Sequence, residues 1–332
     1  MKNKGKTTIK DIAREVNMTT ITVSRALNTP EKVKKETRER ILAVTRRLNY
    51  VPNALARNLK NRESRLIGLI SASFDNPFYG EVIKAISREA KRHDYSILLF
   101  DTDGLLELET RAIDILLSYQ VAGILLSPVS DDDDYLPPYL PRLELTNIPV
   151  IQVDRQIALS KFAGVYLDNV ESGYRGCKAL LHKGYRHLLV VGGPEKSRIT
   201  QARIQGIRRA LDECPDSTQL DVLYGDYTQA PARDEVGRYL ASGRRPEAIF
   251  GLNILITLGA LEAIHLQGLS HRNFGLISID KVPYAEIFGN GIPSVTHDTY
   301  QLGLTAINML LHQIDDPGYQ PMDKIIPGIL QP

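Results

Sequence analysis

Apolar side chains in the first 50 residues recur at helical spacing in three short segments. The first follows Thr8, which can act as an N-cap, ends near Asn17 and carries on its inner face Ile9, Ile12, Ala13 and Val16. The second begins at a turn that Thr19 or Thr20 can cap, and its inner face carries Val23, Ala26 and Leu27. The third covers about 35–49, with an inner stripe of Thr37, Ile41, Val44 and Leu48. The pattern predicts three short helices around a small core, the first two forming a helix-turn-helix.

From Arg65 onward, short continuous apolar runs alternate with amphipathic stretches. The runs predict buried strands at 65–73, 95–101, 123–128, 149–154, 164–168, 187–193, 221–226, 248–252 and 275–280. The amphipathic stretches predict helices at 78–93, 106–119, 171–183, 201–213, 229–242 and 255–267. This alternation predicts parallel, doubly wound sheets in two halves, although no sequence repeat aligns the halves. The fold class is therefore an all-α head followed by an α/β core.

A helix-turn-helix places its second helix in the major groove of DNA. The outward residues Thr20, Ile21 and Arg25 are candidates to touch base edges, and Arg25 is the candidate for guanine. Thr22 and Ser24 are better placed to donate to phosphates, because a short hydroxyl near a helix start reaches the DNA backbone more easily. The other DNA-contact candidates in the head are Thr8, Thr19 and Asn28.

Three motifs carry a resemblance to a known family: TIKDIA at 8–13, VSRALN at 23–28 and NYVPNALARNLKNR at 49–62. With them the chain resembles the LacI-type transcription regulators. The resemblance implies that 51–62 is a hinge that becomes helical on specific DNA, where two hinges of a dimer enter the minor groove. It also implies that Leu59 wedges between base pairs with Ala56 and Lys60 beside it, and Asn53 can cap the hinge helix. A helix this short is marginal alone in water; Leu59 as an ordinary linker residue is the alternative.

Charge is divided unevenly along the chain. Residues 1–62 contain 16 Lys and Arg against 5 Asp and Glu, a net of +11, whereas the whole chain carries +2 and the remainder therefore −9. A basic head supplies sequence-independent affinity for DNA, and an acidic body avoids being trapped on it. A merely solvated basic tail would lack the helical periodicity seen here.

Composition excludes several other classes of protein. With 332 residues and 43% hydrophobic content, the chain fits a globular protein, and it has no apolar run long enough for a membrane and no secretory signal. We therefore expect a cytoplasmic protein without membrane contact, associated with the nucleoid when bound to DNA. Cys177 and Cys214 lack ligand spacing and are expected to be buried, reduced thiols. The acidic run 131–134 is expected to be a solvated turn, since it lacks the interleaved ligands of a calcium loop; no metal and no cofactor are expected.

The resemblance extends to the core, which in that family has the fold of periplasmic sugar-binding proteins, with an effector cleft between two Rossmann-like lobes. It implies a DNA-binding head at 1–50 and a core at 63–332. The first lobe would comprise about 63–166 and 296–316, and the second about 167–295 and 317–332. The chain would cross between lobes near 165–168, 293–297 and 315–320.

Effector-binding candidates follow where strand ends and helix starts converge. Phe78 and Tyr79 match family aromatics that stack on or close over the effector, although packing at a helix start is an equal alternative. Arg203 matches the family arginine that grips polar effector groups, a role suited to a guanidinium fork. The resemblance and the strand-end positions together give the candidate set Phe78, Tyr79, Asp154, Arg155, Arg198, Arg203, Asn253 and Asp280.

Two departures from the family pattern matter. Asn253 is followed by Ile254 where relatives often carry Asn-Asp, so one acid is missing, which eases accommodation of an acidic or phosphorylated ligand if that position faces the cleft. The chain also ends at PGILQP without a tetramerising heptad. We therefore expect a homodimer.

These observations predict an allosteric transcription regulator, expected to be a repressor, that binds double-stranded operator DNA as a homodimer. A small molecule in the cleft would change the spacing of the paired first lobes and so decide whether the hinges fold. A sugar or sugar phosphate is the family's commonest effector; a purine or nucleoside stays open, as does inducer versus corepressor. A solute-binding protein of the same fold is the main rival. An enzyme is not expected, because no phosphate-binding loop, nucleophile elbow or metal spacing occurs.

Overall fold

The structure is a computed structural model that describes residues 7–50, 64–214, 216–288 and 291–331. The chain divides into two compact units, Met1–Glu63 and Ser64–Pro332, here called the head and the core. The hinge candidates Asn53, Ala56, Leu59 and Lys60 lie outside the described residues. Their roles stay predictions.

The head contains the expected three helices. They are α1 (Ile9–Glu15), α2 (Thr20–Asn28) and α3 (Lys35–Arg47), with the short 3₁₀ helix η1 (Pro30–Lys32) between the last two. Thr19 caps α2 by accepting from the backbone N–H of Thr22. A buried centre joins all three helices and consists of Ile12, Ala13, Val16, Val23, Ala26 and Ile41. On α3 the sequence pattern missed Thr45, which is buried. Its hydroxyl donates to the Ile41 carbonyl at 2.8 Å, so the polar group is satisfied inside the helix.

The core is built on two six-stranded sheets. The first has the order β11-β5-β4-β3-β1-β2 and comprises β1 (Leu66–Ser71), β2 (Ser96–Asp101), β3 (Gly123–Leu126), β4 (Val150–Val153), β5 (Gly164–Leu167) and β11 (Lys324–Ile326). The second has the order β12-β10-β9-β8-β6-β7 and comprises β6 (His187–Gly192), β7 (Gln219–Tyr224), β8 (Ala248–Gly251), β9 (Gly275–Ile279), β10 (Ser294–His297) and β12 (Gly328–Gln331). Neighbouring strands pair in parallel except β10 with β12.

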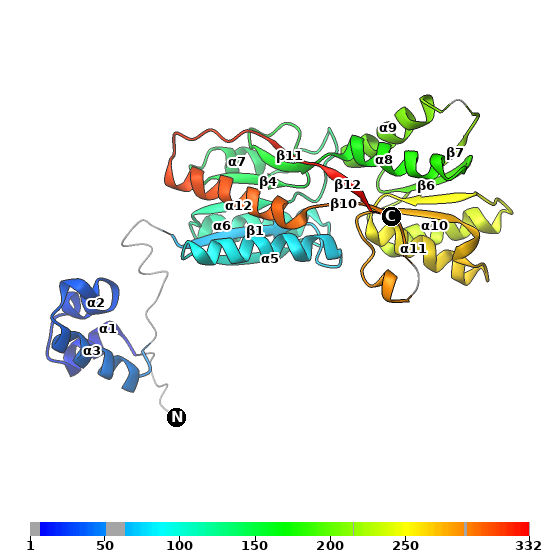
Figure 1. Ribbon diagram of the computed structural model, residues 1–332. Coiled ribbons are helices and arrows are strands. Elements are labelled where there is room, and N and C mark those ends of the chain that lie inside the picture. The colour runs from blue at the N-terminus through cyan, green and yellow to red at the C-terminus, as the bar shows by residue number, and fades with distance from the viewer. Residues whose placement is uncertain (1–6, 51–63, 215, 289–290, 332) are drawn as a thin grey trace. The chain divides into compact units, whose positions relative to one another are not determined.

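Helices cover both faces of each sheet, as the continuous apolar strands require. The first lobe contains α5 (Pro77–Arg92), α6 (Leu106–Ser118), α7 (Leu140–Glu144) and α12 (Thr299–Asp315). The second contains α8 (Asn169–His182), α9 (Arg198–Asp212), α10 (Gln229–Ala241), α11 (Ile254–Leu266) and the 3₁₀ helices η2 (His271–Asn273) and η3 (Ala285–Phe288). Figure 1 shows α12 lying in the same lobe as α5, on which it packs although the two helices are far apart in the sequence. No described helix is long and apolar enough to cross a bilayer.

The chain crosses between the lobes after β5, after β10 and after β11. The first crossing agrees with the expected position near 165–168. The second falls just after the expected range, because β10 runs to His297 within the second sheet. The third was expected near 315–320, and that prediction is wrong. After the turn at Pro317 the chain stays with the first lobe and forms β11, which pairs with β5, so it crosses only at Pro327.

The two crossing helices each pack closely on a helix of the lobe they enter. A Cβ atom at Gly173 of α8 would lie 1.9 Å from the Arg203 carbonyl oxygen of α9. A Cβ atom at Gly303 of α12 would lie 2.6 Å from the Val82 carbonyl oxygen of α5. Glycine is therefore required at both contacts, since neither backbone oxygen can move aside freely. This packing fixes the α9 backbone at Arg203, a candidate site residue.

Candidate functional site

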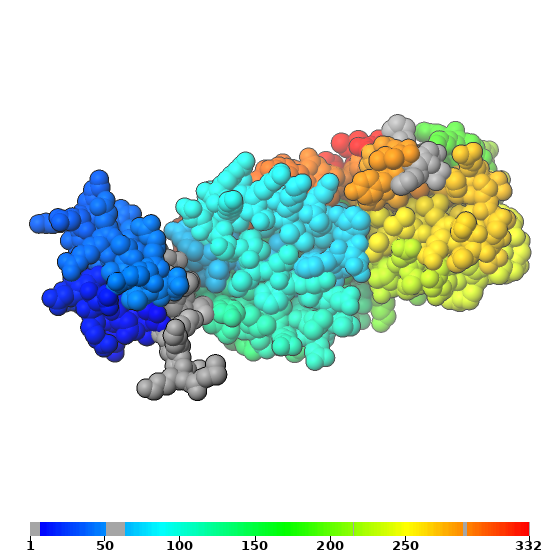
Figure 2. Space-filling view, turned by 90° about the horizontal axis from the view of Figure 1, so that it is seen from below, coloured from blue at the N-terminus to red at the C-terminus, as the bar shows by residue number. Residues whose placement is uncertain are grey.

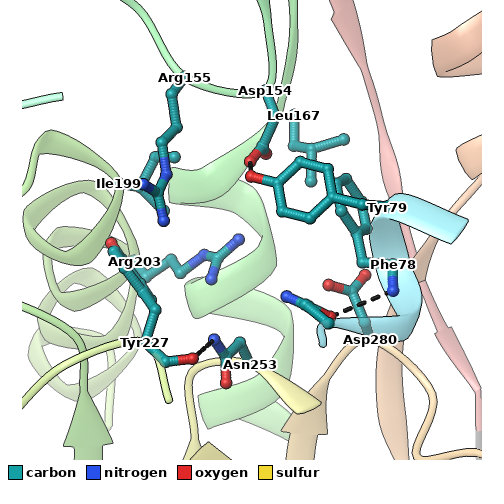
Figure 3. Close-up of a pocket in the computed structure, with 11 residues that line it drawn as sticks. Phe78, Tyr79, Asp154, Arg155, Leu167, Ile199, Arg203, Tyr227, Asn253 and Asp280 are labelled. Atoms are coloured by element: carbon teal, nitrogen blue, oxygen red, sulfur yellow. Dashed lines mark hydrogen bonds between the residues drawn. The ribbon is translucent and has the colours of Figure 1, made fainter. Parts of the chain in front are cut away.

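A pocket between the lobes gathers most of the candidate effector residues (Figure 3). The first lobe contributes Asn76, Phe78, Tyr79, Asp154, Arg155 and Leu167, and the second contributes Ile199, Arg203, Tyr227, Asn253 and Asp280. The cavity measures only about 30 Å³, whereas pockets for small-molecule ligands typically measure about 300 Å³ or more. An adjoining cavity of about 390 Å³ shares Asn76, Tyr79, Arg155 and Tyr227 with it, so in this conformation only the part beside Asp154 and Asp280 is too small for such a ligand.

Two aspartates lie at matching strand ends in the two lobes. Asp154 follows β4 with a φ of 68°, and Asp280 follows β9 with a φ of 64°. The left-handed region is unfavourable for a side chain other than glycine, and such residues cluster at binding sites. In Figure 3 both carboxylates lie close to the helix start that carries Phe78 and Tyr79.

The Asp154 carboxylate is held by Tyr79. The tyrosine hydroxyl donates to Oδ2 of Asp154 at 2.9 Å and lies 3.2 Å from the Ser127 hydroxyl. Burial raises the pKa of Asp154 above its usual range, although the nearby guanidinium groups of Arg155 and Arg203 oppose the shift. Burial also raises the pKa of the Tyr79 hydroxyl, so the tyrosine remains a donor. Tyr79 therefore orients one acceptor of the pocket and does not only pack at a helix start.

The Asp280 carboxylate is held by a buried histidine. Nδ1 of His297 lies 3.0 Å from Oδ1 of Asp280, and Nε2 lies 2.8 Å from the Ser172 hydroxyl, which donates to the Asp168 carbonyl at 2.5 Å. The His297 side chain has no exposed surface. A Cβ atom at Gly328 would lie 2.8 Å from the Ser172 hydroxyl oxygen. The chain of contacts therefore joins a pocket carboxylate to all three segments that cross between the lobes.

The contacts that link Ser172, His297 and Asp280 resemble those of a catalytic triad, but the resemblance does not extend to the accessibility of the serine. Ser172 is fully buried and its hydroxyl is engaged with its own helix, so its oxygen is not presented to the pocket. A nucleophile must be accessible to the group it attacks. The arrangement therefore supports positioning of Asp280 and not covalent catalysis.

Arg203 and Arg155 supply the positive charge of the pocket. Arg203 is buried, and its Nε donates to Oδ1 of Asn169 at 2.8 Å while Nη1 donates to the Leu252 carbonyl. Nη1 of Arg155 donates to the Val129 carbonyl at 2.7 Å, and its guanidinium carbon lies 4.9 Å from the Tyr227 ring centroid. The two guanidinium groups face the pocket from opposite lobes (Figure 3).

Asn253 reaches the pocket but is occupied by local contacts. It caps α11 by accepting from the Ile256 N–H at 2.7 Å, and it donates to the Tyr227 carbonyl at 3.0 Å. The next residue, Ile254, is buried in the hydrophobic cluster of the first lobe, with Leu258 packed against the same cluster. The missing acid is therefore replaced by an apolar contact between the lobes, which meet directly in Figure 2, with the first lobe in cyan and the second in yellow.

One candidate does not line this pocket. Nε of Arg198 lies 3.4 Å from the Asp133 carboxylate, and Nη1 donates to the Gln156 side chain at 3.2 Å. Sequence reasoning missed four lining residues, namely Asn76, Leu167, Ile199 and Tyr227. Tyr227 could have been predicted, because it follows a predicted strand. Nothing in the sequence marked Leu167 or Ile199 as pocket residues.

The acidic run at 131–134 is not simply a solvated turn, and that prediction is wrong for its first residue. Asp131 is buried, and its carboxylate accepts from the Ser197 hydroxyl at 3.0 Å and the Ile199 N–H at 2.8 Å, both in the second lobe. Asp133 and Asp134 are exposed. A consecutive run of acids gave no sign of the helix start that Asp131 caps. Among the described residues no cluster fits a metal ion.

The two cysteines are free thiols. Cys177 is buried and Cys214 half-buried.

The candidate DNA-contact residues of the head lie largely on its surface. Thr8, Thr19, Thr20, Ile21, Arg25 and Asn28 are exposed, and Thr22 and Ser24 are half-buried. Ile21 is 59% exposed, which is unusual for an isoleucine beside a buried helix face. Thr8 is tied to Asp11, whose carboxylate accepts from its N–H at 2.9 Å, and Thr19 is tied to Thr22. The remaining surface of α2 is free to face a duplex.

A helix-turn-helix head joined to a two-lobed α/β core with a charged pocket between the lobes defines the class of ligand-responsive DNA-binding regulators. Residues 8–53 match the family model for bacterial regulatory proteins of the lacI family, and residues 64–330 match the one for periplasmic binding proteins and the sugar-binding domain of the LacI family. The chain belongs to the LacI family.

Two individual relatives match nearly the full length of the chain, and a third matches most of it. The HTH-type transcriptional repressor PurR of Escherichia coli O1:K1 / APEC is 29% identical over 332 residues, covering 98% of this chain and 95% of PurR. The Lac repressor dimer bound to operator and the anti-inducer ONPF superposes with a TM-score of 0.82 at 22% identity, covering 98% of this chain and 97% of the other. The Cra regulator from Pseudomonas putida in complex with fructose 1-phosphate superposes with a TM-score of 0.73 at 18% identity, covering 81% and 98%.

Proposed function

We propose that this chain is a transcriptional repressor whose binding to operator DNA is controlled by a small polar molecule in the pocket between the lobes. The observation that carries the proposal is the pocket itself, in which Asp154 and Asp280 face Arg155 and Arg203 within a chain that also bears a helix-turn-helix head. Such a pocket offers both acceptors and donors to one ligand. Catalysis is not part of the proposal, since the serine beside His297 is buried and engaged.

The ligand we propose is a sugar or a sugar phosphate. Carboxylates accept from hydroxyl groups, and guanidinium forks suit paired oxygens of a hydroxylated or phosphorylated compound. The structural relative Cra holds fructose 1-phosphate, which supports this class. Ile254 stands where an acid would add negative charge, although its burial in the first-lobe cluster means that it acts through packing.

The proposed mechanism couples lobe movement to the head. A ligand held between Asp154, Arg203 and Asp280 needs more room than the cavity of about 30 Å³ there provides, so in this proposal its binding changes the relation between the lobes. In a homodimer on a near-palindromic operator, that change would alter the spacing of the paired first lobes and hence the folding of the hinges at 51–62. The exposed face of α2, with Thr20, Ile21 and Arg25, would read the major groove.

The experiment begins with thermal unfolding of the full chain against a panel of sugars, sugar phosphates and nucleosides, since a ligand that binds the folded core raises Tm. An operator is selected in parallel from a random duplex library. The expected result is a Tm rise with one or more sugars or sugar phosphates, and a change in operator affinity with the same compound. A nucleoside as the only hit would replace the proposed ligand class. Absence of any preferred duplex, with or without the panel, would refute the proposed function.

A further inference from the structure

A contact between the lobes lies beside the pocket, on the loop that follows β3. Asp131 belongs to the first lobe and is only 3% exposed. Its carboxylate accepts from the Ser197 hydroxyl at 3.0 Å and from the Ile199 N–H at 2.8 Å. Ser197 is the N-cap of α9, so an acid of one lobe lies at the first turn of a helix in the other. The positive end of the helix dipole and the free N–H groups favour a negative charge there.

The backbone of the same loop also contacts the second lobe. Asp132 and Ser197 form an isolated antiparallel bridge. Asp133 pairs with Arg198 at 3.4 Å, but both side chains are substantially exposed and such a pair adds little. The buried contact of Asp131 is therefore the main polar tie at this edge of the cleft.

The first lobe holds this loop rigidly from beneath. Glu109 is fully buried and accepts from the Val129 N–H at 2.6 Å and from the hydroxyls of Tyr135 at 2.5 Å and Tyr139 at 2.6 Å. Burial raises the pKa of Glu109, and these three hydrogen bonds oppose that shift. Arg155 adds a hydrogen bond to the Val129 carbonyl. These contacts lie within the first lobe and do not depend on the second, so ordering the loop should add little to the free-energy cost of docking.

The far side of the contact belongs to the pocket wall. The Tyr227 hydroxyl lies 2.5 Å from the Ser197 hydroxyl and 2.8 Å from the Thr200 hydroxyl. Tyr227 and Ile199 both line the pocket, and the Tyr227 ring faces the Arg155 guanidinium. The turn that Asp131 binds is therefore continuous with the residues that would surround a ligand.

We propose that Asp131 is the latch of the pocket: a positioning residue whose carboxylate, by capping α9 from the opposite lobe, holds the two lobes closed. The latch sets how readily the pocket opens to admit and release its ligand. Its regulatory consequence, a change in operator binding, rests on the function proposed above, whereas the closing contact does not.

Hydrogen–deuterium exchange of the full chain tests the latch without ligand or DNA. In Asp131→Ala, amides at the start of α9 and in the 128–132 loop should exchange about tenfold faster, as expected for loss of one charge-assisted contact. Asp131→Asn, which keeps the shape but not the charge, should lie between Asp131→Ala and the parent. Asp134→Ala is the matched control, since Asp134 is exposed on the same loop, and should exchange like the parent. Unchanged exchange in Asp131→Ala would overturn the latch.

A second variant separates lobe opening from local fraying of the loop. Bridged antiparallel positions bring Cα atoms within the range that a disulfide spans. Asp132→Cys with Ser197→Cys, added to Asp131→Ala, should restore slow exchange at the α9 start when oxidised and lose it when reduced. Slow exchange restored only by oxidation supports the latch. If the oxidised protein exchanges as fast as the reduced one, the loss is local and the latch is refuted.

Operator affinity is measured separately on the same variants. If Asp131→Ala speeds exchange but leaves operator affinity and its ligand response as in the parent, the latch is upheld and the coupling in the proposed function fails. If both change together, both are supported.

Discussion

The two lobes of the core share one plan and differ in what their matching residues touch. In each lobe, the fourth strand along the chain, β4 or β9, is followed by an aspartate with positive φ. The next strand leads to a second aspartate, Asp168 or Asp298, that caps a helix entering the other lobe. Asp154 of the first lobe is held by Tyr79, a residue of the pocket wall. Asp280 of the second is held by His297, at a crossing segment. Both aspartates line the pocket, but the partner of Asp154 is itself a pocket residue, whereas the partner of Asp280 lies beside a segment that crosses between the lobes.

The packing of the two helices that follow the crossings, α8 and α12, also differs between the lobes. Gly173 contacts the α9 backbone more closely than Gly303 contacts the α5 backbone, and Gly206 of α9 is equally close to α8. The helix pair that carries Arg203 is thus the more tightly packed of the two. The tightest helix packing therefore surrounds Arg203, which the second lobe contributes to the pocket.

The largest effect is expected from filling these helix contacts. Gly173→Ala should lower the free energy of unfolding by about 3 kcal/mol and Gly303→Ala by about 2 kcal/mol, because the added methyl group meets a backbone oxygen in both and the first space is tighter. Denaturant unfolding measures both. Gly237→Ala, at a helical position with open space, is the control and should not destabilise. Equal losses at 173 and 303 would remove the claimed difference between lobes.

The second largest effect is expected from removal of Arg203, the arginine that the second lobe contributes to the pocket. Arg203→Ala should weaken the best compound from the thermal panel roughly ten- to a hundredfold, since a buried, charge-assisted contact is lost, while ligand-free operator binding persists. Arg208→Ala, an exposed arginine of the same helix that does not line the pocket, is the control and should bind the compound as the parent does. Calorimetry measures the affinity. An intact ligand response in Arg203→Ala would contradict the pocket assignment.

The paired aspartates distinguish the lobes directly. Asp154→Asn and Asp280→Asn should each weaken the ligand by about tenfold. Only Asp280→Asn should also reduce the factor by which the ligand changes operator affinity, because its partner His297 contacts the crossing segments. Operator titrations with saturating ligand measure that factor. A reduced factor in Asp154→Asn alone would reverse the roles given to the lobes.

The smallest expected effect is a dependence of ligand affinity on pH. Burial raises the pKa of Asp154, so the carboxylate takes up a proton at a higher pH than an exposed aspartate does. A ligand hydroxyl needs the ionised acceptor, so affinity should fall as the pH drops toward that raised pKa and should level off above it. In Asp154→Asn this part of the pH dependence should vanish. A parent profile that stays flat down to the usual range of an exposed aspartate would count against it.

Sequence patterns predicted the regular core well because long apolar strands and amphipathic helices carry their period in every residue. They missed the helices α7 and α12 and the strands β10, β11 and β12. These strands are three or four residues long; β11 and β12 lie at sheet edges, and β10 lies beside β12. Strand-end positions and the family resemblance placed Asp154, Arg203 and Asp280 at the site. They did not find Asp131, because a contact between two lobes leaves no periodic pattern in either one. Tyr227 was missed although its place after a predicted strand could have indicated it.

The buried chain of Ser172, His297 and Asp280 has an evolutionary consequence. In the proposed mechanism, transmission of the signal depends on the second lobe and the crossings, where Gly328 leaves no room for a larger residue. Recognition can be retuned through Tyr79 and Arg155 in the first lobe without disturbing those atoms. Duplicated copies of such a gene could therefore acquire new ligands while keeping the same mechanical response.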